Sequence, residues 1–346
     1  MASYSHVPDK PPNHRALSYT DFSNIWLKLE NLQPSGSFKS RGIGNFMVRA
    51  SAAAETRGEG VRFYCSSGGN AGLACITAAN SLSCPVVIVV PMTTSALMVA
   101  RIKVRGAEVH QVGENWPAAD RYLREELLAR DPVGVYVSPF DHVDVWDGAA
   151  TLVDELATQM EEIDCVVCSV GGGGLLNGIM EGISRNSWHP PPKILAIETE
   201  GADSLNLCAR TGTHAALPGI TSIATSLGAT KVSERSYRWL RESPYLTSLV
   251  VSDSHAATSC VRFADDARFL VEPACGATLA VAYFPDVVGL REKVQEGSSK
   301  EWSHHNVVLV VCGGSATTLD MLENYRTEFT VTTEQMNSDG EMIGGP

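Results

Sequence analysis

The chain has 346 residues, of which 44% are hydrophobic and 19% are charged, and its formal net charge is −12. This length allows two lobes with separate cores, and the composition is that of a globular protein. A negative charge without a basic run excludes the electrostatic footprint that nucleic-acid binding requires, so we expect no nucleic-acid partner.

Apolar runs and cysteine usage give an expectation for the compartment. The longest runs, such as residues 86–90 and 307–311, are of strand length and too short to cross a bilayer. The first residues, through His14, are polar and proline-rich, unlike a signal peptide. Nine cysteines, several of them within apolar runs, are typical of buried free thiols. We therefore expect a soluble cytoplasmic protein without membrane contact.

Short apolar runs followed by glycine or polar turns predict strands. In chain order they are residues 25–29, 61–65, 86–90, 165–168, 194–197 and 307–312. Runs rich in valine, isoleucine and leucine without alternation suit strands buried on both faces of a parallel sheet. Helical periodicity lies between them, as in Leu152, Leu156 and Met160. The prediction is an α/β fold, with doubly wound, mostly parallel sheets and helices on both faces.

Lys39 follows a Pro-Ser-Gly-Ser turn and stands at the start of a predicted helix. The positive end of a helix and partial desolvation by Phe38 both disfavour the ammonium form, which leaves the amine available for imine formation. The alternative interpretation is a solvated lysine on a surface helix, the usual place of a lysine.

Three glycine-rich loops follow predicted strands. The asparagine loop (residues 66–72, Ser-Ser-Gly-Gly-Asn-Ala-Gly) offers amides for a carboxylate and, in Asn70, a carboxamide for a hydroxyl or phenolate oxygen. The glycine loop (residues 170–175, Val-Gly-Gly-Gly-Gly-Leu) predicts a phosphate cup at a helix start, or else a flexible turn. The cysteine loop (residues 312–316) places Cys312 at a sheet end, where a thiol can face a ring nitrogen or lie buried.

Together these segments resemble the serine/threonine dehydratase family of fold-type II pyridoxal phosphate enzymes, most closely its L-serine dehydratase branch. The resemblance covers about residues 25–325. It rests on motifs at residues 34–39, 66–72, 171–174, 198–204, 271–277 and 312–315, in the family's order. There are two departures: residues 12–17 replace the usual Thr-Pro-Leu segment, and Ala316 stands where relatives have asparagine.

The resemblance implies a role for each matching residue. Lys39 would hold pyridoxal 5'-phosphate as a Schiff base, with Phe38 against the ring. The other cofactor-binding residues would be Asn70 at the phenolic oxygen, Gly171, Gly172, Gly173, Gly174 and Leu175 at the phosphate, and Cys312 at the pyridine nitrogen. The substrate-binding residues would be Ser67, Gly68, Asn70 and Ala71. A monovalent cation such as K⁺ would be held by Gly171, Glu198, Ala202, Leu227 and Ala229.

The implied activity is β-elimination from a small amino acid. L-Serine would give pyruvate, and L-threonine 2-oxobutyrate, each with ammonia. Gly68, where many relatives have alanine, is expected to add room in the pocket and to favour serine by degrees. The alternatives are β-replacement, racemisation or a specialised biosynthetic step on the same scaffold, and a non-catalytic binding protein.

The family also implies the organisation of the chain. We expect a large cofactor-binding domain of residues 1–42 and 143–346, with a loose tail from residue 330, and a small domain of residues 43–142. A homodimer is the usual assembly.

The remaining cysteine and histidine candidates are expected to be structural or solvated and to have no catalytic or metal-binding role. Cys165 and Cys168 resemble half a metal site, but an odd separation on a strand turns their thiols to opposite faces. His142 is expected to be structural, and His304 and His305 to be solvated.

Overall fold

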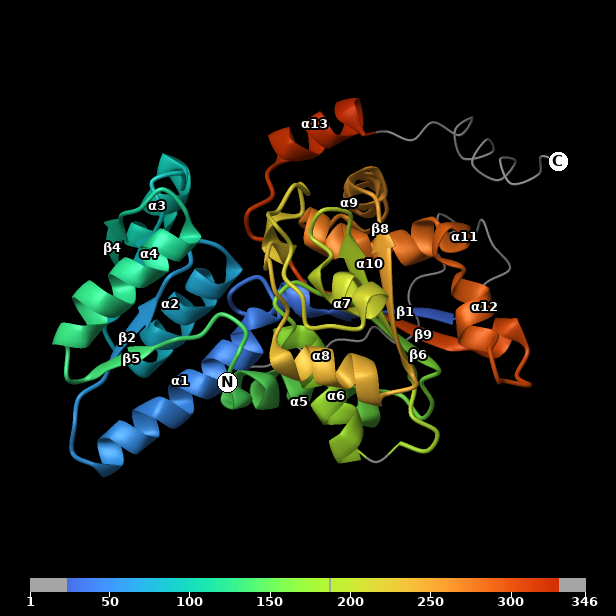
Figure 1. The fold of residues 1–346 in the computed structure, drawn as a ribbon, viewed down its shortest axis with the longest axis horizontal. Coiled ribbons are helices and arrows are strands. Elements are labelled where there is room, and N and C mark those ends of the chain that lie inside the picture. Colours follow the sequence, from blue (N-terminus) through green and yellow to red (C-terminus); the bar gives the residue numbers. More distant parts are fainter. Residues whose placement is uncertain (1–23, 187, 330–346) are drawn as a thin grey trace.

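The computed structural model describes residues 24–186 and 188–329, which form two lobes, each built on a parallel sheet (Figure 1). The α/β fold with helices on both sheet faces is thereby confirmed. Residues 12–17, which differ from the family's Thr-Pro-Leu segment, and the expected loose tail from residue 330 lie outside the described residues. Within the described part of the chain, no helix has the length and apolar character needed to cross a bilayer.

The smaller sheet has the order β4-β3-β2-β5, and its neighbouring strands run parallel. Its strands are β2 (Arg62–Cys65), β3 (Val86–Val90), β4 (Glu108–Gln111) and β5 (Gly134–Tyr136). Side chains of α1 (Lys39–Thr56), α2 (Asn70–Leu82) and α3 (Ala96–Val104) share one core with this sheet. Those of α4 (Trp116–Tyr122) form a second cluster with Tyr64, Val87 and Val89 on the opposite face.

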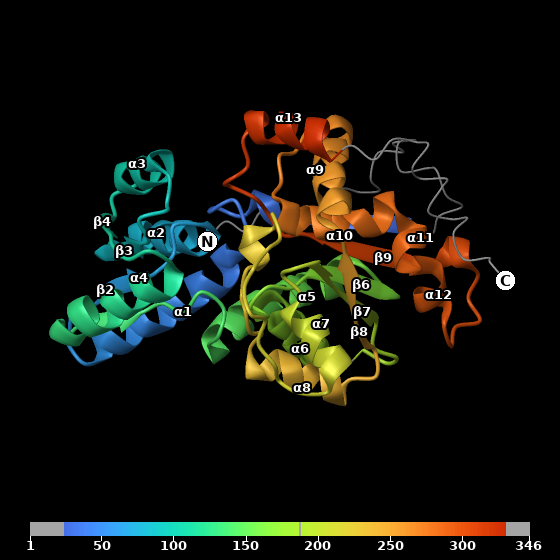
Figure 2. The same cartoon turned by 45° about the horizontal axis from the view of Figure 1, so that its top comes forward.

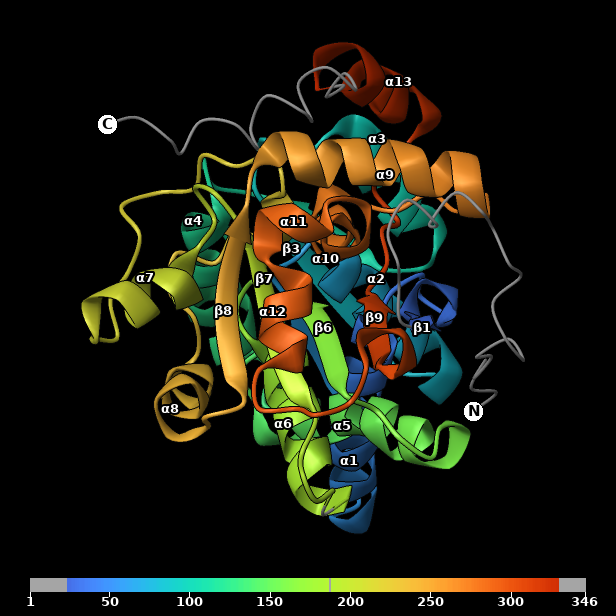
Figure 3. The same cartoon turned by 90° about the vertical axis from the view of Figure 1, so that its right-hand side faces the viewer.

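The larger sheet has the order β1-β9-β6-β7-β8 and is also parallel. Its strands are β1 (Asn24–Leu29), β6 (Cys165–Ser169), β7 (Lys193–Thr199), β8 (Leu246–Val251) and β9 (Asn306–Val311). Helices α5 (Val143–Gln159) and α6 (Gly174–Asn186) lie on one face, and α9 (Asp253–Ala267) and α10 (Pro273–Tyr283) on the other (Figure 1; Figure 3). The remaining helices are α7 (Ser204–Thr211), α8 (Glu234–Glu242), α11 (Pro285–Val288), α12 (Leu290–Gln295) and α13 (Leu319–Glu328).

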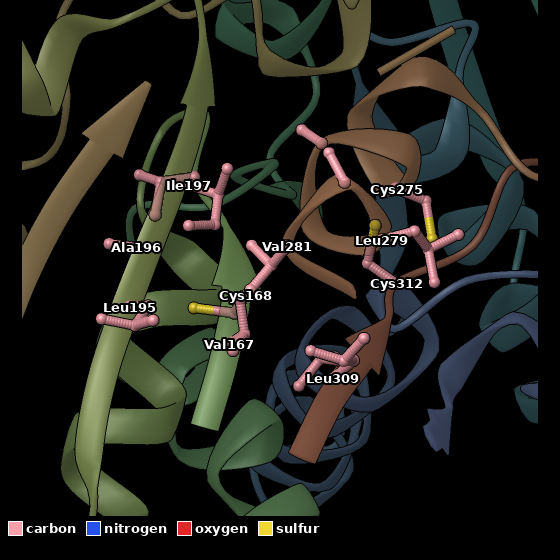
Figure 4. Close-up of a cluster of buried hydrophobic side chains, with 14 of the residues drawn as sticks. Val167, Cys168, Leu195, Ala196, Ile197, Cys275, Leu279, Val281, Leu309 and Cys312 are labelled. Carbon is pink, nitrogen blue, oxygen red and sulfur yellow. The ribbon is translucent and has the colours of Figure 1, made fainter. Parts of the chain in front are cut away.

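The core of the larger lobe covers both faces of its sheet, and one part of it lies between the central strands and α10. Val167 of β6, Leu195 of β7 and Leu309 of β9 are buried, and Leu279 and Val281 of α10 come toward them (Figure 4). Continuous burial on both faces explains why these strands lack alternation.

Helix α1 connects the two lobes. It packs against α5 of the larger lobe and α2 of the smaller one (Figure 1; Figure 2). Because α1 packs against both lobes, its contacts do not assign it to one of them. The domain boundaries at residues 42 and 142 therefore stay a prediction.

Candidate active site

Lys39 is the first residue of α1 and is half-buried. Its Nζ donates a hydrogen bond to the Pro139 carbonyl and lies 5.1 Å from the centroid of the Phe38 ring. Burial lowers the pKa of Lys39 from 10.5 to about 8, although the Cys65 and Cys312 thiols oppose the shift. This is not the solvated surface lysine of the alternative interpretation, because its amine readily loses its proton.

A buried ion-pair network fixes the start of α1. The Arg41 guanidinium donates to both oxygens of Glu30, at 2.7 and 2.8 Å, and to both oxygens of Glu155, at 2.8 and 2.7 Å. The Lys28 amine adds a 2.5 Å contact to Glu155. Removing one partner of such a buried pair costs about 3–5 kcal/mol, so the network holds Lys39 through its helix.

The cysteine loop is attached to the chain just before Lys39. The Phe38 amide donates to the Cys312 carbonyl at 3.0 Å, and Ser37 forms an antiparallel bridge with Gly313. Cys312 is buried, and Cys275 of α10 lies beside it (Figure 4). Hydrogen bonds from Cys275 and from Ser169 Oγ to its sulfur, the latter at 3.5 Å, lower the pKa of the Cys312 thiol.

The glycine loop leads from β6 into α6 and carries a run of free donors. The amides of residues 171–176 donate no hydrogen bond to any part of the chain that the structure describes. Gly173 has a φ of +94°, and a Cβ on Gly172 would lie 2.4 Å from Cγ of Phe140. Unpartnered amides at a helix N-terminus, without side chains to block them, form an anion site.

The asparagine loop leads from β2 into α2 on the opposite lobe. Within the described residues, the amides of Asn70, Ala71 and Gly72 have no hydrogen-bond acceptor. Ser67 Oγ accepts from the Gly69 amide at 3.3 Å. This loop is a second anion site by the same argument, and no basic side chain is needed for it.

Contacts of Asn70 bring the two lobes together. Its Nδ2 donates to both Glu272 oxygens, at 3.1 and 3.0 Å, and its Oδ1 accepts from Ser315 Oγ at 2.7 Å. Lys39, both anion loops and Cys312 therefore belong to strand and helix ends that meet where the lobes face each other.

Known proteins share this chain's sequence and fold. A model of the family described as "Pyridoxal-phosphate dependent enzyme" matches residues 13–313. An L-serine dehydratase of Saccharomyces cerevisiae is 39% identical over 328 residues, which cover 90% of this chain and 95% of the relative. A human L-serine dehydratase/L-threonine deaminase is 38% identical, covering 94% and 96%. The chain belongs to the L-serine dehydratase family.

Solved structures agree with this assignment. A fungal L-serine ammonia-lyase from Rhizomucor miehei superposes with a TM-score of 0.83 at 33% identity, covering 95% of this chain and 99% of that one. A threonine deaminase of Solanum lycopersicum, at 24% identity and a TM-score of 0.76, shares the fold. The chain is a pyridoxal-phosphate dependent enzyme, and the free amides of the glycine loop fit the phosphate of that cofactor.

The predicted cation ligands are only partly brought together. Gly171 lies against Leu227, with 3.0 Å between an added Cβ and the Leu227 Cα. The Ala202 amide donates to Thr199, and that of Ala229 to Leu227. The buried Glu198 carboxylate accepts from the Leu205 and Asn206 amides at 2.8 and 2.7 Å. Burial raises the pKa of Glu198 to about 8.

Most predictions for the cysteine and histidine candidates agree with the structure, and the prediction for His305 does not. Cys165 and Cys168 are buried free thiols, and the described residues contain no group of three or more His, Cys, Asp or Glu that could hold a metal. His142 is structural, since its Nδ1 accepts from the Asp144 amide at the start of α5. The expectation for His305 was wrong: it is buried, and its ring hydrogen-bonds Glu301 and Ser298.

The expectation that Gly68 adds room in the substrate pocket was also wrong. A Cβ at this position would point into the smaller lobe, 3.0 Å from Val90, 3.4 Å from Thr94 and 3.7 Å from Ile102. The alanine methyl that many relatives carry at this position would therefore pack behind the loop, against the smaller lobe, and not in the substrate pocket.

We expect Gly68→Ala to lower the free energy of unfolding by about 1 kcal/mol, because the methyl overpacks against Val90. The displaced loop should raise KM for the substrate and leave cofactor affinity unchanged. Urea unfolding and cofactor titration check this, with Gly44→Ala as control, since a Cβ there meets nothing within 4 Å. A more stable variant with unchanged KM would contradict it.

Proposed function

We propose that the enzyme deaminates L-serine to pyruvate and ammonia, and L-threonine, as a second substrate, to 2-oxobutyrate and ammonia. One observation carries the proposal: an amine with a pKa of about 8, on Lys39, shares a site with two loops of unpartnered amides. The names of the yeast and human relatives support the substrate class.

The residues of the site suit the cofactor as follows. Lys39 would attach it, and residues 171–175 would bind its phosphate through their amides. Phe38 would pack against its ring, Asn70 Nδ2 would donate to its phenolic oxygen, and Cys312 would meet its pyridine nitrogen. When bound, pyridoxal phosphate supplies the electron sink for charge that develops at the substrate Cα.

The chain itself binds the substrate and moves the proton. Amides of the asparagine loop, around Ser67, Gly68 and Ala71, would hold the substrate carboxylate. The Lys39 amine would then accept the Cα proton, which its lowered pKa allows near neutral pH. Loss of the β-hydroxyl as water, followed by hydrolysis, gives the keto acid and ammonia.

Product analysis tests the reaction type. L-Serine should yield ammonia and pyruvate in equal amounts, and L-threonine ammonia and 2-oxobutyrate at a lower rate. Release of D-serine without ammonia would point to racemisation, and a requirement for a second nucleophile to β-replacement. A spectral response to serine without either product would contradict the deaminase proposal and leave the cofactor assignment intact.

Attachment of the cofactor should depend on pH through Lys39. Only the deprotonated amine is nucleophilic, so the attachment rate of the cofactor-free protein should rise with pH and level off above a midpoint of about 8. Rapid-mixing absorbance at a series of pH values measures this. A rate that still climbs toward pH 10.5, the ordinary lysine pKa, would contradict the burial argument.

We also propose a monovalent-cation site at Glu198, Gly171, Ala202, Leu227 and Ala229. The buried Glu198 carboxylate has no cationic side chain within ion-pair distance among the described residues, and Ser204 Oγ nearby in sequence is buried without a partner. Oxygen ligands of this kind suit a hard cation such as K⁺.

Replacing K⁺ by tetramethylammonium should therefore lower activity and melting temperature, because the bulky ion cannot enter. The Glu198→Gln variant should have the same activity and melting temperature in the two salts. Equal activity of the parent enzyme in both salts would exclude the site.

We further propose that the enzyme is a cytoplasmic homodimer. The nine free cysteines support a reducing compartment. Leu97, Val104 and Leu319 are exposed large apolar side chains that a second copy could cover. Light scattering gives the mass in solution that decides between one copy and two.

A further inference from the structure

Glu272 is a buried carboxylate to which the family resemblance gives no role. It is 5% exposed and precedes Pro273, the first residue of α10. Its side chain makes no capping bond to its own helix, where the Cys275 and Gly276 amides bond instead to the Glu272 carbonyl. The carboxylate is therefore free to bind groups outside α10.

Donors from three separate segments surround this carboxylate. Asn70 Nδ2 donates to both oxygens, Ser226 Oγ to one of them, and the Ala316 amide to the other at 3.2 Å. No Lys, Arg or His among the described residues lies within ion-pair distance of Glu272. A buried charge that rests on neutral donors alone places strict demands on their orientation.

The contact determines which way the Asn70 carboxamide points. Glu272 can only accept, and Ser315 Oγ donates to Asn70 Oδ1 at 2.7 Å. A flipped carboxamide would set Oδ1 against the carboxylate, with two acceptors facing each other. Both Glu272 oxygens lie at similar distances from Nδ2, 3.1 and 3.0 Å, so one hydrogen can be shared between them and the second remains for the proposed phenolic oxygen of the cofactor.

The same contact joins the lobes. Asn70 starts α2 of the smaller lobe, whereas Ser315 and Ala316 follow β9 of the larger one. Arg101 of α3 adds a 2.5 Å bond to the Ser315 carbonyl. Ala316 contributes its backbone amide, which explains why a chain without the family's asparagine there can still form the contact.

We propose that Glu272 is a positioning residue that orients the Asn70 carboxamide and couples the asparagine loop to the cysteine loop. The inference deepens the proposed function, since it rests on Asn70 facing the cofactor.

Hydrogen exchange of the cofactor-free protein tests the inference without turnover. Glu272→Gln should speed exchange of the amides in residues 66–72 and 313–316 and leave the core of β6 protected. The matched control is Asp131→Asn, a partly buried carboxylate that accepts from the Tyr64 hydroxyl at 2.7 Å and, within the described residues, has no hydrogen bond or ion pair with either loop. Unchanged exchange in both loops, or equal acceleration by the control, would overturn the proposal.

Cofactor affinity separates positioning from general destabilisation. Glu272→Gln should weaken cofactor binding about tenfold, as expected for one lost charge-assisted hydrogen bond. In an Asn70→Ala background the same substitution should have no further effect, because it acts through Asn70. Additive losses would contradict the inference. If serine were not deaminated while exchange behaved as expected, only the proposed function would fail.

Discussion

Lys39→Ala should abolish deamination, with a loss of more than about 10³-fold, because one amine both attaches the cofactor and accepts the Cα proton. The variant should still bind pyridoxal phosphate through the glycine loop, though without a covalent bond. Ammonia release measures the first effect. Gel filtration after borohydride reduction measures the second: the variant should keep the cofactor under native conditions and lose it under denaturing ones, whereas the parent should keep it under both.

Lys103→Ala is the matched control, since Lys103 is an exposed lysine of α3 outside the site. It should keep parental activity. Residual turnover of Lys39→Ala within tenfold of the parent would mean that another group accepts the proton, and the assignment of Lys39 would be wrong.

Gly173→Ala should weaken cofactor binding by about 10²-fold or more, because it disrupts the loop that offers the phosphate its donors. Gly173 has a φ of +94°, where a Cβ is strained, and that Cβ would lie 2.0 Å from Ser236 Oγ. The loop must then shift and its amides turn from their common point. Equilibrium titration of the cofactor-free variant gives the affinity.

The comparison with Gly44→Ala isolates this effect from glycine replacement in general, because a Cβ on Gly44 meets nothing within 4 Å. That variant should bind the cofactor as the parent does. An unchanged dissociation constant for Gly173→Ala would show that the amides of residues 171–175 do not hold the phosphate.

The sequence predicts the central strands because they are buried on both faces. Residues 86–90 and 307–311 are continuous runs of branched residues and form β3 and most of β9. Three edge strands, β4, β5 and β8, were not predicted from the sequence. Glu108, His110 and Gln111 make β4 look like a polar loop, and β8 is only partly buried.

For the site, chemistry carried by one loop could be predicted, and chemistry shared between lobes could not. Lys39 and the glycine loop could each be predicted from one short stretch of sequence, because each stretch carries its own chemical pattern. Glu272 meets Asn70 from 202 residues away, and its role lies in that contact. The prediction for Gly68 was wrong because the sequence alone does not show in which direction a Cβ at that position would point. Arg41 was not singled out from the sequence, and its buried ion pairs join it to residues 11 and 114 positions away.

Borohydride reduction of the enzyme with its cofactor, followed by peptide mapping, tests the central claim most directly. Reduction fixes the cofactor to whichever lysine carries it. We predict that its mass is found on the peptide containing Lys39, and on no other. Labelling of a different lysine, such as Lys103, or recovery of all lysines unmodified would contradict the account.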